Sequence, residues 1–379
     1  FFHFRKRFQL GYKGCEKMKA AIVNKETGKP EIVDVPIPEI QEGEILFKPM
    51  ACGVCGSDVI DWNINGPGSF GHEPAGIVVK VGKNVKNVKE GDRIFVHHRV
   101  PNPDCRFFRR GHGTVCPEYP QYGFIPSAYA EFTRVTERHV RLDLIHLPDH
   151  ISFEVGALIE PMATMWRLMS RAGLQGGDTV LVIGAGALGL SAIQVAQRLG
   201  ATMVINSDYN DWKLEYSKAL GVDFTINRGK HTLDEIKEII RESNEGRLAD
   251  VVVVIPPRIK ALEEGIELTE KGGVVSQFGP TGPGEVLTID PNYFFFREIT
   301  YAASYSSTPN ETKMVADFIF KGKLKVKHLI THHYTLDQIM EALALKKKAE
   351  DSLKIMVHPH PDEYFGSNPK DYGPYSFGD

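Results

Sequence analysis

Residues 179–189 have the sequence Thr-Val-Leu-Val-Ile-Gly-Ala-Gly-Ala-Leu-Gly and decide the fold class of this 379-residue chain. Five strand-forming residues precede glycines at 184, 186 and 189, a spacing typical of a strand that turns tightly into a helix. Gly184 permits the turn, Gly186 lets the backbone approach a pyrophosphate, and Gly189 allows close packing of helix on strand. Asp208 ends the next predicted strand. The stretch therefore predicts a dinucleotide-binding βαβ unit.

Strands and helices alternate from this stretch onward. We expect strands over residues 178–183, 202–207, 224–226, 250–255 and 273–278, and helices over residues 187–199, 211–220, 232–242 and 259–268. Such alternation predicts right-handed βαβ units and a parallel sheet that helices cover on both faces. The run Asp-Val-Val-Val-Val-Ile at 250–255 is apolar without alternation, as expected of a strand buried on both sides.

The preceding region, residues 18–149, has the pattern of a β-rich domain. Short β-prone runs at 19–24, 31–35, 44–51, 76–81, 92–97 and 132–135 are separated by glycine, proline and asparagine turns. Beyond residue 300 we expect one further helix, 313–321, and an extended tail, 358–379. The fold class is thus α/β, in four parts: an extension (1–17), the β-rich domain (18–160), the doubly wound domain (161–305), and a return to the first domain with the tail (306–379).

Composition excludes several classes of function. Lys and Arg total 45 and Asp and Glu total 48, so the net charge of −3 favours neither nucleic acid nor an anionic membrane as a partner. Residues 179–196 contain too many glycines to predict a membrane span. Five cysteines do not make a disulfide scaffold and indicate a reducing, cytoplasmic location. Residues 1–17 favour an extension before a natural start at Met18, with a transit peptide or interaction arm as the alternative.

A second cluster of reactive residues precedes the nucleotide motif. Cys55 is followed by Gly-Ser-Asp, and His72 and Glu73 follow Gly71. A thiolate and an imidazole are good zinc ligands, and a carboxylate can complete the set. Cys55 or His72 alone would more often be a core residue, but the glycine motif downstream favours a metal site.

The ordered motifs resemble those of the zinc-containing medium-chain dehydrogenases/reductases, and among them the sorbitol (L-iditol) and related polyol dehydrogenases. The resemblance is carried by 53–58 (GVCGSD), 71–76 (GHEPAG), 91–93 (GDR), 160–163 (EPMA), 184–189 (GAGALG), 272–273 (GG) and 278–279 (FG). It extends from Met18 to about Val357. It implies a GroES-like β domain that holds a catalytic zinc ion and a Rossmann domain that binds the nicotinamide cofactor.

The resemblance also assigns residues to the metal and to the reaction. Cys55, His72, Glu73 and Glu160 would surround the zinc ion, and the carboxylate at 160, where alcohol dehydrogenases place another ligand, points toward polyols. The alternative for Glu160 is an ordinary acid at a helix N-terminus before Pro161. Ser57 would join Cys55, His72, Glu73 and Glu160 in catalysis, bonding the substrate oxygen and passing its proton outward, while Asp58 would organise the surroundings of the ligands.

The cofactor is expected to be NAD, because Asp208 would accept hydrogen bonds from ribose hydroxyls and repel a 2′-phosphate. No arginine occurs at 209–211, although Lys213 leaves NADP open. The cofactor-binding set comprises Gly184, Gly186, Ala187, Leu188, Gly189, Asp208, Lys213, Phe278 and Gly279.

We therefore expect hydride transfer from a secondary hydroxyl of a polyol, sugar or cyclitol to NAD. The alternatives are a secondary-alcohol or L-threonine-type dehydrogenase on the same fold and, more remotely, a non-catalytic nucleotide-binding protein. The resemblance implies a homodimer or homotetramer built by pairing of sheet edges, for which residues 300–305 are a candidate.

The sequence departs from the family pattern at two sites. Ile60 occupies the position of a common proton-relay histidine. The four cysteines of the family's structural zinc lobe fall on Asn102, Cys105, Phe108 and Cys116, with His112 nearby but off-register. We expect the structural zinc to be absent and Cys105 and Cys116 to be free thiols, or less favourably a disulfide, because a closed zinc site needs four ligands.

Four further features invite interpretation. The short loop 59–70 is expected to widen the substrate entrance and to suit a bulky polyol or cyclitol. Cys52 is expected in the core. His97 and His98 are adjacent on a predicted strand, so at most one of them should face the cleft. The serines and tyrosine of 304–306 are candidates for substrate or subunit contacts.

Overall fold

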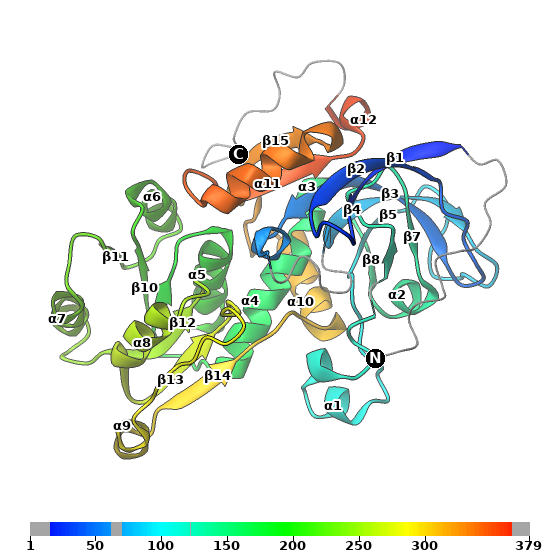
Figure 1. Ribbon diagram of the computed structural model, residues 1–379. Helices are drawn as coiled ribbons and strands as arrows, with labels where there is room; N and C mark the ends of the chain where they lie inside the picture. Colours follow the sequence, from blue (N-terminus) through cyan, green and yellow to red (C-terminus); the bar gives the residue numbers. More distant parts are fainter. Residues whose placement is uncertain (1–15, 62–69, 122, 366–379) are drawn as a thin grey trace.

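The computed structural model describes residues 16–61, 70–121 and 123–365. The chain forms two sheet-based halves joined by a helix that runs between them (Figure 1). One half is drawn green to yellow, and the other is blue to cyan. The orange and red C-terminal segment lies against the blue half, so segments far apart in sequence share one domain.

The green and yellow half contains a six-stranded parallel sheet with the order β11-β10-β9-β12-β13-β14. Numbered within this half, the order is 3-2-1-4-5-6, which is typical of dinucleotide-binding folds. The strands are β9 (Thr179–Ile183), β10 (Met203–Asp208), β11 (Phe224–Asn227), β12 (Ala249–Val254), β13 (Thr269–Gln277) and β14 (Thr300–Ala303). The helices are α5 (Ala187–Leu199), α6 (Asp211–Ala219), α7 (Leu233–Ser243), α8 (Ile259–Glu267) and α9 (Pro291–Arg297). The predicted alternation of strands and helices is confirmed.

The other half is built on an eight-stranded sheet among the described residues. Its main path is β15-β16-β3-β4-β5-β8, and β7 joins β3 to β6. The strands are β3 (Ile45–Val54), β4 (Glu73–Val81), β5 (Arg93–Val96), β6 (Phe124–Ile125), β7 (Thr133–Val135), β8 (Leu144–His146), β15 (Ile330–Thr335) and β16 (Lys354–His358). A separate antiparallel pair consists of β1 (Lys17–Val23) and β2 (Pro30–Pro36).

Short helices connect these strands, and two longer ones follow the doubly wound half. They are η1 (Gly56–Val59), α1 (Arg106–Arg109), η2 (Gly113–Val115), α2 (Glu137–Leu142), α3 (Phe153–Ala157), α10 (Pro309–Phe320), η3 (Lys327–Leu329), η4 (Leu336–Gln338), α11 (Ile339–Lys348) and α12 (Pro361–Phe365). No described helix combines the length and the apolar character that crossing a bilayer requires.

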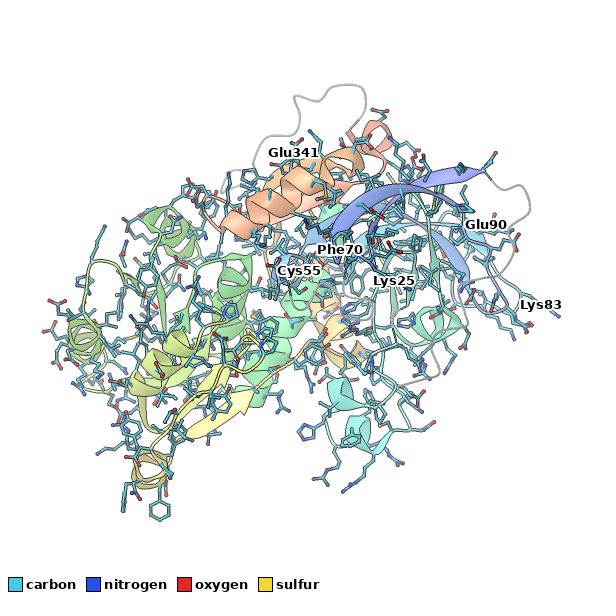
Figure 2. All side chains as sticks on the ribbon, in the orientation of Figure 1. Lys25, Cys55, Phe70, Lys83, Glu90 and Glu341 are labelled. Atoms are coloured by element: carbon cyan, nitrogen blue, oxygen red, sulfur yellow. The ribbon has the colours of Figure 1, made fainter. Side chains whose placement is uncertain are left out.

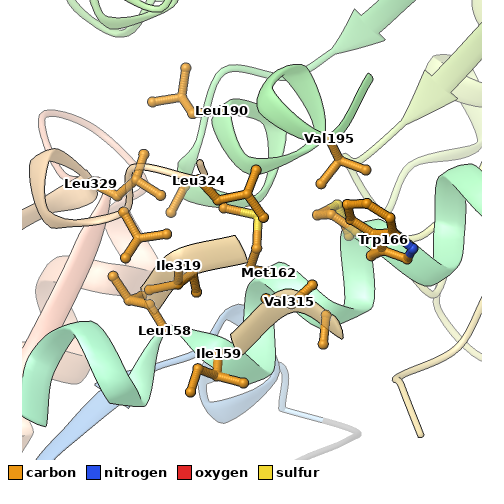
Figure 3. Close-up of a cluster of buried hydrophobic side chains, with 14 of the residues drawn as sticks. Leu158, Ile159, Met162, Trp166, Leu190, Val195, Val315, Ile319, Leu324 and Leu329 are labelled. Atoms are coloured by element: carbon orange, nitrogen blue, oxygen red, sulfur yellow. The ribbon is translucent and has the colours of Figure 1, made fainter. Parts of the chain in front are cut away.

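The helix between the halves is α4 (Ile159–Ala172), which was not among the predicted helices. All of its residues except Ser170 and Arg171 are buried, so even its polar residues Glu160 and Arg167 lie inside the molecule. Figure 3 shows its side chains packed among those of α5, α10 and the following segment: Leu158, Ile159, Met162, Trp166, Leu190, Val195, Val315, Ile319, Leu324 and Leu329. This shared core fixes one half against the other.

The C-terminal segment differs from expectation. The predicted helix is present as α10, and two strands and α11 follow it between residues 330 and 358, where a return to the first domain was expected but no element was predicted. Strand β16 pairs with β3 on one side and with β15 on the other, so this late segment completes the first sheet. The tail is not extended at 361–365, where α12 forms, and its remainder, 366–379, lies outside the described residues.

Candidate metal centre and cofactor site

Three predicted metal ligands meet where β3 and β4 pair. Cys55 follows β3, while His72 and Glu73 lie at the start of β4, and Glu73 is directly opposite Gly53 in the antiparallel register. A thiol, an imidazole and a carboxylate atom from these three residues all lie within 4.8 Å of one another. Figure 2 shows Cys55 near the middle of the molecule, between the two halves. This donor set fits zinc, which takes sulfur, nitrogen and oxygen ligands.

Asp58 contacts two of these three candidate ligands. Its Oδ2 accepts hydrogen bonds from the Cys55 backbone N–H at 3.0 Å and from the Tyr129 hydroxyl at 2.8 Å. Its Oδ1 lies 3.5 Å from Nδ1 of His72. Burial lowers the pKa of His72, but the neighbouring Cys55 and Asp58 outweigh it and raise that pKa well above its ordinary value. Asp58 therefore orients both Cys55 and the His72 ring.

Glu73 is held by a buried lysine from the C-terminal strand. Lys354 Nζ donates to both Glu73 carboxylate oxygens, at 2.6 Å and 2.8 Å, and each side chain is 3% exposed or less. A Cβ at Gly53 would lie 2.1 Å from Glu73 Oε2, so any larger residue at this position would displace the carboxylate. The strand pairing and the lysine together fix the position of this carboxylate.

Glu160 lies in an adjoining group with His97 and His98. Its Oε1 is 3.8 Å from His97 Nε2 and 4.0 Å from His98 Nδ1, and the ring centroids of His98 and His72 are 4.9 Å apart. Burial raises the pKa of Glu160 to about 7, and Glu73 acts in the same direction. The role of Glu160 as a metal ligand stays a prediction.

The expectation that His97 and His98 face opposite ways is wrong. Strand β5 ends at Val96, so the alternation of a strand does not apply to the two histidines. Their rings stack with centroids 4.5 Å apart, and both face Glu160. Burial lowers the pKa of His97 to about 3 and that of His98 well below its ordinary value, so both rings are neutral near pH 7.

The segment after β14 is hydrogen-bonded to His97 and to residues near it. Ser307 Oγ lies 3.1 Å from His97 Nε2, and the Tyr119 hydroxyl donates to Ser306 Oγ at 2.7 Å. Tyr305, 53% exposed, contacts Arg99 through its hydroxyl. Part of the 304–306 segment is therefore engaged in holding the two halves together.

The expected remnant of a metal lobe contains two free cysteines. Cys105 and Cys116 are hydrogen-bonded through their side chains, and both are free thiols. Among the described residues they join no group of three potential ligands, and His112 instead contacts Arg171 at 3.0 Å. Cys52 is fully buried in the core of the β-rich half, as expected. Most of the loop 59–70, namely residues 62–69, lies outside the described residues.

The glycine motif has the geometry that a nucleotide phosphate requires. Gly184 adopts φ 104° at the end of β9, and a Cβ at Gly189 would lie 1.9 Å from the Gly184 carbonyl oxygen. A Cβ at Gly186 would meet nothing within 4 Å, so space is left in front of the α5 N-terminus, where Ala187 and Leu188 begin the helix. A helix N-terminus approached in this way binds anions.

Asp208 accepts a hydrogen bond from the backbone of the glycine motif. Its Oδ2 accepts from the Ala185 N–H at 2.7 Å and its Oδ1 from the Asn210 N–H at 2.9 Å. Two nearby cations are directed elsewhere: Lys213, 8% exposed, donates to the Ala349 carbonyl, and Arg228 pairs with Glu264.

Phe278 and Gly279 follow β13, on the same edge of the sheet as the glycine motif. The Phe278 N–H donates to the Val254 carbonyl at 3.1 Å, and a Cβ at Gly279 would lie 2.4 Å from the Ile255 carbonyl oxygen. The backbone is therefore closely packed at this point of the cofactor edge.

Sequence reasoning missed three side chains of the candidate metal centre. Lys354 is buried, Lys346 is partly buried, and Tyr129 bonds Asp58. Burial, with the charge of Lys354, lowers the pKa of Lys346 to about 8. A signal was available for Lys354, which interrupts the apolar run Leu-Lys-Ile-Met-Val, because a buried lysine requires an acidic partner.

Comparisons with known proteins agree with this geometry. A family model described as alcohol dehydrogenase GroES-like domain matches residues 41–149, and one described as zinc-binding dehydrogenase matches residues 187–321. Sorbitol dehydrogenase from Bacillus subtilis (strain 168) is 31% identical over 357 residues, 91% of this chain and 98% of that protein. L-threonine 3-dehydrogenase from Pyrococcus abyssi (strain GE5 / Orsay) is 32% identical over 353 residues, covering 90% and 99% of the two chains.

A solved structure is similar over the same range. A zinc-binding dehydrogenase from Sinorhizobium meliloti 1021, crystallised with NADP bound, has a TM-score of 0.81 at 25% identity and covers 91% of this chain and 100% of its own. The similarity thus includes both halves and the helix between them.

Proposed function

Because the chain belongs to the zinc-containing medium-chain alcohol dehydrogenase family and is an oxidoreductase of alcohol groups, we propose that it oxidises a secondary hydroxyl of a polyol, sugar or cyclitol with NAD. The observation that carries the proposal is the convergence of Cys55, His72 and Glu73, with a further buried carboxylate, Glu160, beside them.

Cys55, His72 and Glu73 would hold the catalytic zinc ion, with Glu160 as an additional or exchanging ligand. When bound, zinc supplies a Lewis acid that makes a hydroxyl more acidic, and the nicotinamide supplies a hydride acceptor. Asp58 keeps the His72 ring in place, and Lys354 neutralises part of the charge of Glu73.

Ser57 is the residue proposed to handle the substrate proton. It lies in η1, two residues after Cys55, and is partly exposed, whereas Asp58 is 1% exposed and already bonded to Tyr129 and Cys55. The Ser57 hydroxyl can donate one hydrogen bond and accept another, as a proton passing outward requires. Ile60 has no titratable group to continue the path, so the proton would leave through water or cofactor hydroxyls.

NAD is preferred over NADP in this proposal. Asp208 places a carboxylate at the end of β10, and the nearby Lys213 and Arg228 are bound to Ala349 and Glu264. A 2′-phosphate would therefore meet a negative charge without these two cations to compensate it. The NADP bound by the relative from S. meliloti is the reason that both cofactors belong in the test.

An L-threonine-type activity is the second candidate. The P. abyssi relative with that activity is as similar as the sorbitol dehydrogenases. The Glu160 carboxylate favours a polyol, because its two oxygens can accept hydrogen bonds from several hydroxyls.

The test is initial-rate formation of reduced cofactor by zinc-loaded protein with sorbitol, xylitol, myo-inositol, 2,3-butanediol, 2-propanol and L-threonine, each with NAD and with NADP. The proposal predicts the highest kcat/KM for a polyol or cyclitol with NAD. The highest value for L-threonine would establish the second candidate, and cofactor binding without turnover on any compound would support a non-catalytic role.

Association and location complete the proposal. Strand β14 lies at the edge of its sheet and contains Tyr301, which is 42% exposed, while Phe295 and Phe296 of the preceding α9 are 74% and 77% exposed. We propose that two copies pair at this edge, as a homodimer or as half of a homotetramer. The free state of Cys52, Cys55, Cys105 and Cys116 supports a reducing, cytoplasmic location.

A further inference from the structure

A second group of potential metal ligands lies inside the β-rich half, where α3, β15 and β16 meet. It consists of Glu154 from α3, His333 from β15 and His358 from β16. Their side chains are 1% exposed or less. None of the three belongs to the catalytic group around Cys55 or to the adjoining group around Glu160.

The three donor atoms form a compact triangle. Glu154 Oε1 is 2.9 Å from His333 Nδ1 and 3.1 Å from His358 Nε2, and the two nitrogens are 3.3 Å apart. Ligands of a tetrahedral zinc ion, at about 2.0–2.1 Å from the metal, are separated from each other by about 3.3 Å. The triangle therefore has nearly the dimensions of one face of a zinc coordination sphere.

The backbone fixes which nitrogen of His358 points to this triangle with a lone pair. His358 Nδ1 lies 3.1 Å from the Met50 carbonyl oxygen, and because a carbonyl only accepts, Nδ1 carries the hydrogen. In the neutral ring, Nε2 then carries the lone pair that could bind a metal ion in the triangle. A metal-binding histidine typically donates its other N–H to a backbone carbonyl in this way.

The Glu154 carboxylate of the triangle is a buried negative charge, and both histidines contact it. Burying a charge is costly unless it is compensated. A metal ion at the centre of the triangle would bind all three donor atoms and neutralise the carboxylate.

We propose that Glu154, His333 and His358 form a second, non-catalytic site for a divalent transition-metal ion of the zinc type. Two imidazoles and a carboxylate suit zinc better than calcium or magnesium, which prefer oxygen ligands. The ion would join α3 to the C-terminal strands. It would also stabilise β16, which carries Lys354 on the same face as His358, four residues and about 13 Å along the strand.

Metal content of the full-length protein tests this site apart from the catalytic one. We expect about two zinc ions per chain in the wild-type protein and about one in Cys55→Ala. Adding His358→Gln to Cys55→Ala should remove the remaining ion. Adding His97→Gln instead should leave it in place, which makes His97→Gln the matched control for the neighbouring Glu160 group.

Cobalt provides a second readout that does not depend on activity. In cobalt-loaded Cys55→Ala the proposal predicts visible d–d bands without a thiolate charge-transfer band, and their loss in the double variant with Glu154→Gln. Glu154→Gln keeps the side-chain shape, so it covers the case in which His358→Gln does not fold. Zinc-free Cys55→Ala, zinc that survives loss of His358 or Glu154, or zinc that leaves with His97→Gln would each overturn the proposal.

Discussion

Lys354 Nζ lies 2.6 Å and 2.8 Å from the two carboxylate oxygens of Glu73, in an ion pair that is almost completely buried. The two residues are 281 positions apart. The pairing of β16 with β3, and of β3 with β4, brings them together. The last strand of the described residues thus supplies the counter-charge for a proposed metal ligand near the beginning of the chain.

Removing this lysine should damage both stability and metal binding. Lys354→Met leaves the Glu73 carboxylate buried and uncompensated, a change that costs about 3–5 kcal/mol in comparable buried pairs. Denaturant unfolding and zinc affinity measure the two effects. Lys354→Arg keeps the charge and should retain most of the stability; equal losses in both variants would show that the charge is not what matters.

Gly53→Ala should weaken zinc binding, although Gly53 is not itself a proposed ligand. Its Cβ would lie 2.1 Å from Glu73 Oε2, so the carboxylate must move. We expect a loss of roughly 10- to 100-fold in zinc affinity, as for other changes that displace a metal ligand's support. Gly56→Ala is the matched control, because its Cβ meets nothing within 4 Å, and it should bind zinc like the wild type.

Asp208→Asn should relax the choice of cofactor. Removing the negative charge while keeping an acceptor oxygen should lower the ratio of kcat/KM for NAD to that for NADP by at least about tenfold. Asp211→Asn removes an exposed acid three residues away, which pairs with Lys230, and should leave the ratio unchanged. An unchanged ratio in Asp208→Asn would mean that other groups select the cofactor.

Because of Asp143, the free energy of unfolding should fall as the pH rises. Burial raises the pKa of this carboxyl to about 7, although Thr312 donates to it at 2.8 Å. In the unfolded chain the pKa is about 3.9, so between pH 4 and 7 the folded state binds the extra proton and stability falls with rising pH. The loss approaches roughly 4 kcal/mol above pH 7, at about 1.4 kcal/mol per unit.

The corresponding variant is Asp143→Asn, which keeps an acceptor for Thr312. Its unfolding free energy should exceed that of the wild type at pH 8 by more than at pH 4. Parallel stability curves for the two proteins across this range would contradict the assignment.

The doubly wound half was predictable because its signals are local. The glycines at 184, 186 and 189 and the apolar run of β12 are set by neighbours in the sequence. Cys55, His72 and Glu73 were also found, because β3 and β4 lie close together in the chain and their motifs are specific.

The remaining parts depend on contacts that no local pattern contains. Helix α4 was not among the predicted helices, and its burial between the two halves is set by long-range contacts with both of them. Lys354 becomes interpretable only when β16 is placed beside β3, and His97 and His98 share one direction only because β5 stops at Val96. Long-range pairing and the end of a strand decide these positions.

The most direct test of the account is a zinc titration of metal-depleted enzyme, followed by the rate of NADH formation from its best polyol. The account predicts no turnover before zinc is added and recovery as the Cys55–His72–Glu73 site fills. His72→Ala should fail to recover at the zinc concentration that saturates the wild type. Turnover by protein that metal analysis shows to be zinc-free, at the rate of the zinc-loaded enzyme, would contradict the central claim.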